Sequence, residues 1–206
     1  MLSAQNVVAG YVDEINILQN VSVDVHKQQI TSVIGPNGSG KSTLMRVICG
    51  FLKPKSGQVM WDDKDLTGRP SHTMAGLGIC YLPQERTVYP HLTVEQNIHL
   101  GSWTFRRDKA RIRDELARVY DLFPLMRERR KSKAGDLSGG MQKILEVARG
   151  MMIRPEILIC DEPTVGLAPI IAKEVYDTIE RLKADGLTIL LVDQNVREAI
   201  RIGDYV

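Results

Sequence analysis

Residues 35–43 read GPNGSGKST and constrain the fold more than any other stretch of this chain. They match the pattern G-x-x-x-x-G-K-[ST], in which a glycine-rich turn joins a buried strand to a helix. The flanks fit, because the β-branched run at residues 30–34 predicts a strand and the apolar spacing over residues 42–50 predicts a helix. Such a turn offers backbone N–H groups and a positive helix end to an anion, so we expect it to bind the phosphates of a nucleotide.

Each position of this turn has a chemical reason. Gly35, Gly38 and Gly40 are expected to let the backbone turn tightly against phosphate oxygens. Lys41 is expected to reach the β- and γ-phosphates, and the Ser42 hydroxyl to ligate Mg²⁺. The predicted nucleotide-binding segment comprises Gly35, Pro36, Asn37, Gly38, Ser39, Gly40, Lys41, Ser42 and Thr43.

The composition restricts the classes of protein that remain. The 206 residues carry 27 basic and 25 acidic side chains, so the net charge gives no general argument for nucleic acid as a partner. Cys49, Cys80 and Cys160 are scattered in apolar runs, which favours free thiols in a reducing compartment over a metal site. No apolar run approaches the roughly 18 residues that a membrane-spanning helix needs. We therefore expect a cytoplasmic protein whose contact with a membrane is peripheral.

The remaining periodicity predicts an α/β fold. Apolar runs at residues 77–82, 157–160 and 188–192 predict further buried strands, and residues 169–184 predict a helix. Alternation within residues 1–29 predicts two or three antiparallel strands, with another at residues 58–61.

The charged stretch between these strands is a separate unit. Residues 88–135 open with a capping box at 93–96 and are expected to form an inserted helical subdomain of a single domain spanning residues 1–206. Its basic residues suggest a solvated helix face more than a nucleic-acid surface. Residues 204–206 resemble the start of another strand, so we expect the natural chain to continue.

Polar residues follow three of the predicted strands, at the edge where open α/β sheets bind ligands. Gln84 follows what we expect to be a central strand, and its amide either ligates Mg²⁺, holds a water or is an ordinary loop residue. Asp161 suits the Mg²⁺ shell, and Glu162 suits the orientation or deprotonation of an attacking water. Gln194 suits donation of a hydrogen bond to a γ-phosphate.

Two other features have both a functional and a simpler interpretation. Ser138, Gly139 and Gly140 precede a helix expected from about residue 142, and they form either a second anion-binding turn or an ordinary N-cap with flexible glycines. Tyr11, in a turn after Gly10, either stacks on a base or packs against the protein; from the residues alone, packing is the more common case.

The order of these motifs is more specific than any one of them. The segment 35–43, Gln84, LSGGM at 137–141 and ILICDEPT at 157–164 together resemble the ATP-binding subunits of ABC transporters over essentially the whole chain. The resemblance implies a P-loop NTPase with a RecA-like core, an antiparallel β subdomain and an inserted helical subdomain. It also implies two such domains facing each other, with each ATP held between the P-loop of one and the LSGG segment of the other.

The resemblance also implies residue roles. Tyr11 matches the aromatic that stacks on adenine, which reverses the preference stated above. Gln84 matches the glutamine that senses Mg²⁺ and the membrane subunit, and Ser138 and Gly140 would contact the γ-phosphate of the partner's ATP. The implied catalytic residues are Glu162, Lys41 and Gln194, and the implied metal-binding residues are Ser42, Gln84 and Asp161.

Four positions depart from the family's pattern. Gln194 stands where a histidine is usual, and glutamine cannot carry a proton at neutral pH, which favours Glu162 as the base. Ala168 replaces the usual aspartate of the following loop, which puts the usual communication between the two sites in doubt. Met141 replaces the fifth signature residue, and Gln28 replaces a glycine before the P-loop strand.

The segments 83–97, 166–170 and 191–195 are similar to the second ATP-binding subunit of branched-chain amino-acid importers. This subgroup implies ATP and Mg²⁺, transmembrane permease subunits, a second ATP-binding subunit that is identical or related, and indirectly a solute-binding protein. It implies a peripheral location on the cytoplasmic face of the inner membrane and no nucleic acid. ATPases for urea uptake or lipopolysaccharide export, a non-transport ABC ATPase and a regulatory module without turnover remain the alternatives.

Overall fold

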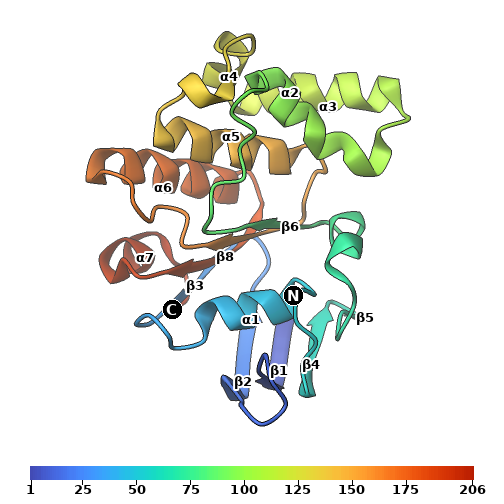
Figure 1. Ribbon diagram of the computed structural model, residues 1–206, viewed down its shortest axis with the longest axis vertical. Helices are drawn as coiled ribbons and strands as arrows, with labels where there is room; N and C mark the ends of the chain where they lie inside the picture. Colours follow the sequence, from blue (N-terminus) through green and yellow to red (C-terminus); the bar gives the residue numbers. More distant parts are fainter.

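The base of the molecule is an antiparallel sheet with helix α1 packed above it (Figure 1). The computed structural model describes residues 1–206. This sheet has the order β2-β1-β4-β5, and it contains the two predicted N-terminal strands and the predicted strand near residue 60. Its strands are β1 Leu2–Ala9, β2 Leu18–Val25, β4 Ser56–Trp61 and β5 Lys64–Asp65.

The second sheet is parallel and carries the site. Its order is β3-β8-β7-β6, so all four strands predicted for it are present. The strands are β3 Ile30–Ile34, β8 Thr188–Asp193, β7 Ile157–Asp161 and β6 Ile79–Leu82. The prediction that the strand before Gln84 is central is wrong, because β6 pairs only with β7 and forms the sheet edge. Both faces of β6 are covered, and so its apolar run looks like that of a central strand.

Alternate residues of the parallel strands enter two different cores. On β7, Ile157 and Ile159 face α1 and the antiparallel sheet, whereas Leu158 and Cys160 face the layer of longer helices. Every residue of β7 and β8 is buried. Burial on both faces fixes the register of these strands, because a shift by one residue would exchange the two cores.

The helices lie mainly on the far side of the parallel sheet, where α5 and α6 cover it and α2 to α4 lie beyond them (Figure 1). The predicted capping box is present, with Thr93 and Gln96 exchanging side-chain hydrogen bonds. The helices are α1 Lys41–Ile48, α2 Val94–His99, α3 Lys109–Leu122, α4 Pro124–Glu128, α5 Gly139–Met151, α6 Pro169–Ala184 and α7 Val196–Ile202, with short 3₁₀ turns at Ser71–Thr73, Ala75–Leu77, Leu100–Phe105 and Ala134–Asp136.

Two boundaries differ from expectation. Helix α5 begins three residues before the predicted start, because Ser138 caps it by accepting from the Met141 N–H. Helix α7 was not assigned from the sequence. Near the end of the sequence, Tyr205 forms an isolated parallel bridge with Thr31, and the Ser32 N–H donates to the Tyr205 carbonyl at 2.8 Å.

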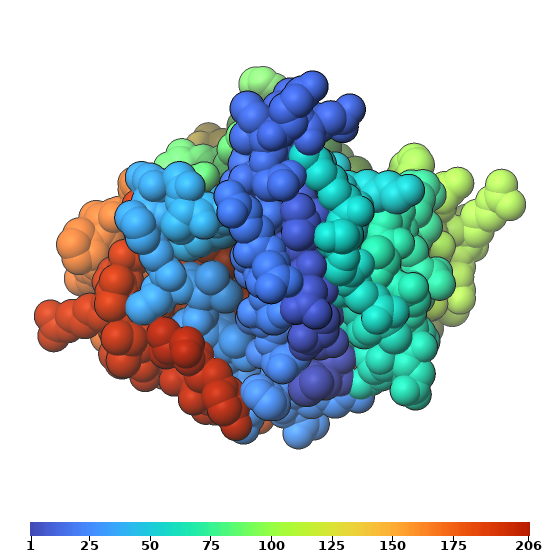
Figure 2. Space-filling view, turned by 90° about the horizontal axis from the view of Figure 1, so that it is seen from below, coloured from blue at the N-terminus to red at the C-terminus, as the bar shows by residue number.

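The structure also describes the length of the helices, the state of the three cysteines and the face formed by the N-terminal strands. No helix combines the length and the apolar character needed to cross a bilayer. The three cysteines are free, with Cys49 and Cys160 buried and Cys80 half-buried. Figure 2 shows the N-terminal strands as a ridge across one face, with the α1 segment on one side and the chain that follows β4 on the other.

Candidate active site

The glycine-rich turn has the backbone geometry that the motif requires, with one correction. Gly38 and Gly40 have φ of 81° and 94°, and Gly40 is the residue at which α1 starts. Gly35 does not adopt this left-handed conformation. A Cβ built on Gly35 would lie 2.9 Å from the Ser39 hydroxyl oxygen, so glycine at this position allows the turn to pack closely.

The Lys41 side chain is buried and folds back over the turn. Its ammonium donates to the carbonyl oxygens of Gly35 at 2.8 Å and Pro36 at 3.0 Å. It also lies 3.7 Å from the Glu162 carboxylate, with both side chains only 5% exposed. The turn therefore holds a desolvated positive charge in place where phosphates are expected.

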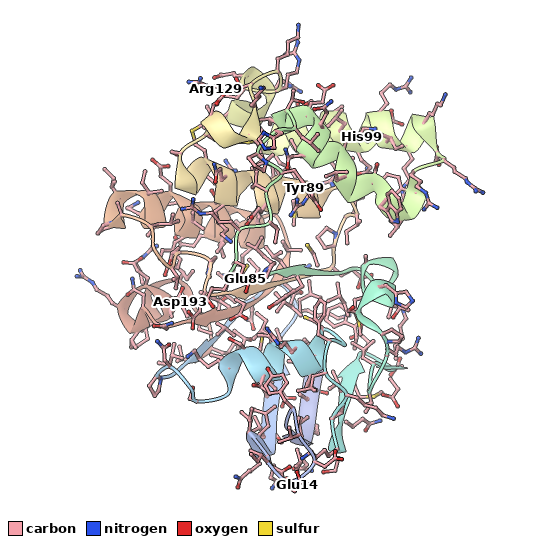
Figure 3. The ribbon with its side chains drawn as sticks, viewed as in Figure 1. Glu14, Glu85, Tyr89, His99, Arg129 and Asp193 are labelled. Carbon is pink, nitrogen blue, oxygen red and sulfur yellow. The ribbon has the colours of Figure 1, made fainter.

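Glu162 is the centre of the arrangement. It follows β7 with φ of 46°, an uncommon conformation for this residue type, and its N–H donates to the Val192 carbonyl at 2.8 Å. One carboxylate oxygen accepts from the Gln84 amide at 3.0 Å and from the Gln194 amide. Three predicted site residues from the ends of three parallel strands thus meet at one carboxylate. Figure 3 labels Glu85 and Asp193, which lie beside Gln84 and Gln194 in sequence at this sheet edge.

Asp161 lies next to Ser42, at the start of the P-loop helix. Its two oxygens accept from the Ser42 hydroxyl at 3.4 Å and from the Tyr81 hydroxyl at 3.1 Å. Burial raises the pKa of Asp161, with the neighbouring Glu162 charge acting in the same direction. A buried carboxylate beside a hydroxyl is the hard oxygen donor set that suits Mg²⁺ completed by phosphate oxygens. The structure holds no cluster of three or more acidic, histidine or cysteine side chains that would bind a metal without such a ligand.

A cavity of about 390 Å³ opens over the P-loop. Nine of its ten lining residues are predicted catalytic, metal-binding or nucleotide-binding residues, and the tenth is Ile17. The lining residues are Ile17, Asn37, Gly38, Gly40, Lys41, Ser42, Thr43, Gln84, Glu162 and Gln194.

Tyr11 lies at the margin of this region. Its ring is about half exposed, and its hydroxyl is 3.4 Å from the Thr43 hydroxyl. The loop that follows it is held by Lys55, whose ammonium donates to the carbonyls of Val12, Asp13 and Ile15 and to the Asn16 side chain. The aromatic face is thus presented on an organised loop near the P-loop.

The LSGG segment is not part of the cavity. Ser138 serves as the N-cap of α5, which agrees with the simpler of the two interpretations offered above. Gly140 packs so closely on α6 that a Cβ there would lie 2.1 Å from the Ile171 side chain. The structure therefore separates Ser138, Gly139 and Gly140 from the other predicted site residues.

Helix α5 is nevertheless tied to the Gln84 loop by three buried or half-buried charged side chains. Lys143 donates to the Pro83 carbonyl at 3.2 Å and pairs with Glu146 at 2.8 Å. Glu146 accepts from the Thr87 N–H, and Arg149 donates to the Thr87 carbonyl at 2.8 Å. We call Lys143, Glu146 and Arg149 the α5 clamp.

Sequence reasoning missed several residues that shape the site. Tyr81 holds Asp161, Lys55 holds the Tyr11 loop, and the α5 clamp holds the Gln84 loop. Of these residues, only Tyr81 could have been identified from the sequence, because it lies three residues before Gln84 in a predicted strand. Gln28 takes the left-handed φ of 59° that glycine usually provides, and its N–H is satisfied by the Thr188 hydroxyl at 3.0 Å.

Comparison with known proteins gives consistent matches. The sequence profile described as "ABC transporter" matches residues 18–165. The probable branched-chain amino acid transport ATP-binding protein LivF of Archaeoglobus fulgidus is 43% identical over 99% of this chain and 86% of its own length. The high-affinity branched-chain amino acid transport ATP-binding protein BraG of Pseudomonas aeruginosa is 40% identical over 96% of this chain and 84% of its own length.

A solved structure shows the same fold. It is an ATP-binding cassette of an ABC transporter in its ADP conformation, with a TM-score of 0.88 and 31% identity over 99% of this chain and 85% of that one.

Proposed function

Because this chain belongs to the ABC transporter family, as an ATP-binding subunit that hydrolyses ATP, we propose that it powers the uptake of branched-chain amino acids through separate membrane subunits. The identity of 40–43% with two subunits named for that transport, over nearly the whole chain, supports the substrate class. The convergence of Lys41, Gln84 and Gln194 on Glu162 supports the catalytic mechanism.

The P-loop side of the mechanism is electrostatic. The Lys41 ammonium exchanges its carbonyl partners for the β- and γ-phosphates, and the N–H groups at the start of α1 bind further phosphate oxygens. Ser42, Gln84 and Asp161 would hold Mg²⁺, which when bound offsets the negative charge on the phosphates. The Tyr11 ring stacks on the adenine.

The chemical step uses Glu162. Its carboxylate accepts a proton from the water whose oxygen attacks the γ-phosphorus, and the bond to the leaving ADP oxygen breaks. Gln194 donates a hydrogen bond to the γ-phosphate but takes no proton. The amide groups of Gln84 and Gln194 hold the carboxylate before substrate arrives, so little reorganisation is needed.

The LSGG segment acts on a second subunit. Solved cassettes of this fold include dimers, and we propose that Ser138, Gly139 and Gly140 bind the γ-phosphate of the facing subunit's ATP. Their separation from the chain's own cavity supports this arrangement. Closure of the pair would then drive transmembrane permeases, supplied by a solute-binding protein, from a peripheral position on the cytoplasmic face of the inner membrane.

The catalytic assignment is tested with Glu162→Gln, which keeps the shape and the amide contacts but removes the base. We expect ATP to bind with unchanged affinity while turnover falls at least about 100-fold. The same substitution at the exposed Glu128 on α4 is the matched control and should leave turnover unchanged. Near-normal turnover of the Glu162 variant would refute the assignment.

The transport assignment is tested by purifying the tagged chain with its membrane partners. Recovery of permeases whose solute-binding protein binds leucine would support it. Permeases that serve another solute would refute the substrate class and leave the ATPase assignment intact. Recovery of ribosomal or DNA-bound proteins without a permease would refute transport altogether.

A further inference from the structure

Two loops leave the parallel sheet side by side and carry the two side chains that meet at the reacting phosphate in the proposed mechanism. The loop after β7 begins with Glu162, and the loop after β8 carries Gln194. They are neighbours because Asp161 pairs with Val192 in parallel register, and because the Glu162 N–H donates across to Val192. The distance between Glu162 and Gln194 therefore depends on what holds these loops together beyond the last paired residues.

A single phenol on α6 joins the two loops. The Tyr176 hydroxyl lies 2.7 Å from the carboxylate of Asp193, the last residue of β8, and 2.8 Å from the hydroxyl of Thr164 in the loop after β7. Tyr176 is fully buried, and Asp193 and Thr164 are 2% and 8% exposed. Because a carboxylate only accepts, the phenol donates to Asp193, and the Thr164 hydroxyl is left to donate to the phenol oxygen. The hydrogen bonds therefore run in one direction, from the Thr164 hydroxyl to the Tyr176 hydroxyl and from there to the Asp193 carboxylate.

The Asp193 carboxylate depends on that phenol. Its other oxygen accepts from the Asn195 N–H at 2.8 Å, so each oxygen has its own donor. Burial raises the pKa of Asp193, and the hydrogen bonds from Asn195 and Tyr176 act in the opposite direction. A cavity of about 450 Å³, lined in part by Thr164, Tyr176 and Asp193, adjoins the group. Because a cavity borders the carboxylate, its position is defined by the hydrogen bonds from Tyr176 and Asn195 in addition to packing.

Gln194 follows Asp193 directly, so a change in the Asp193 side chain displaces the amide that reaches Glu162. We propose that Tyr176 is a positioning residue for ATP hydrolysis, which fixes Gln194 against Glu162 by holding Asp193 and Thr164 together. This inference rests on the proposed roles of Glu162 and Gln194. Helix α6, which follows the Glu162 loop, contributes no residue to the lining of the P-loop cavity. Under this proposal it nevertheless affects the chemical step through Tyr176.

The test is Tyr176→Phe, which removes one oxygen and keeps the ring. We expect kcat for ATP to fall about tenfold or more, with KM and the affinity for a fluorescent ATP analogue within twofold of the starting protein. Tyr120→Phe is the matched control, because Tyr120 is a buried tyrosine whose hydroxyl also donates to a carboxylate, that of Glu95, away from the site. Its kcat should stay within twofold, whatever its effect on Tm.

A rescue variant separates positioning from general structural damage. Asp193→Asn in the Tyr176→Phe background removes the buried charge that lacks a donor, and an amide still accepts from the Asn195 N–H. Recovery of at least a third of the lost kcat would support the proposal. Two results would overturn it, provided that Glu162→Gln is inactive. One is a kcat of Tyr176→Phe within twofold of the starting protein, and the other is a loss of nucleotide affinity as large as the loss of kcat. Turnover in Glu162→Gln would overturn the catalytic assignment itself, and with it this inference.

Discussion

The α5 clamp contains a buried ion pair whose removal should be far more damaging than the removal of an exposed one. Lys143 and Glu146 have side chains that are 6% and 1% exposed, and their charged atoms are 2.8 Å apart. The Glu146 oxygen that lies 2.8 Å from the Lys143 ammonium has no other hydrogen-bond partner, and the second oxygen accepts only from the Thr87 N–H. Lys143→Met removes that ammonium and leaves a buried carboxylate without its paired cation.

The magnitude follows from the asymmetry between breaking a buried pair and replacing it. Removing one partner of such a pair costs about 3–5 kcal/mol, which is a large share of a total stability of about 5–15 kcal/mol. At about 2–4 °C per kcal/mol for a chain of this size, Tm should fall by about 6–20 °C. Adding Glu146→Gln should recover about half of the loss, because glutamine carries no charge and still accepts from the Thr87 N–H.

Lys173 provides the matched control. It pairs with Asp177 at 2.6 Å on α6, with the two side chains 67% and 46% exposed, so Lys173→Met should cost only about 0.3–0.5 kcal/mol. Thermal and urea denaturation followed by circular dichroism measures the stability of these three variants and of the starting protein. If Lys143→Met and Lys173→Met cost the same within about 0.5 kcal/mol, or if the double variant is less stable than Lys143→Met, the argument from burial is wrong.

Two further predictions concern the stacking of Tyr11 on adenine and the loss of stability at acidic pH. Tyr11→Ala should raise the dissociation constant for ATP about tenfold or more, since stacking on a base contributes about 1–3 kcal/mol, whereas Tyr11→Phe should bind within twofold; equal affinities in a fluorescence titration would exclude stacking. Burial acts to raise the pKa of Glu115, but the hydrogen bonds from Arg154 and Arg118 outweigh it, so its folded pKa lies below the usual 4.5. Its ionised form therefore stabilises the protein above pH 4.5, and this contribution is lost as the pH falls from 4.5 through the folded pKa. The Tm difference between the starting protein and Glu115→Gln should accordingly be large at pH 7 and shrink by pH 3.5; a difference that does not change with pH would contradict it.

The features predicted correctly from the sequence are those with a local cause. The P-loop strand, the helix at residues 169–184 and the capping box at Thr93 each depend on residues within a few positions of one another. The placement of Gln84 beside Glu162 was accessible too, because the carboxyl ends of parallel strands meet at one edge.

The features that were missed depend on contacts between distant residues. Tyr176 and Asp193 are 17 positions apart, and Glu146 and Thr87 are 59 apart, so no periodicity signals either contact. The place of β6 at the sheet edge was mistaken because an edge strand covered on both faces has the same apolar pattern as a central one.

The α5 clamp also has a consequence for timing. It attaches α5, whose N-cap is Ser138, to the loop that carries Gln84. In the proposed dimer, Ser138 binds the facing subunit's ATP, while Gln84 touches the Glu162 that acts on the chain's own ATP. Because the α5 clamp connects Ser138 with the Gln84 loop, we expect nucleotide binding at one site to shift residues of the other site. In that proposed dimer, each subunit would relay the occupancy of its neighbour's site to its own Glu162, and the two hydrolysis events would be coupled.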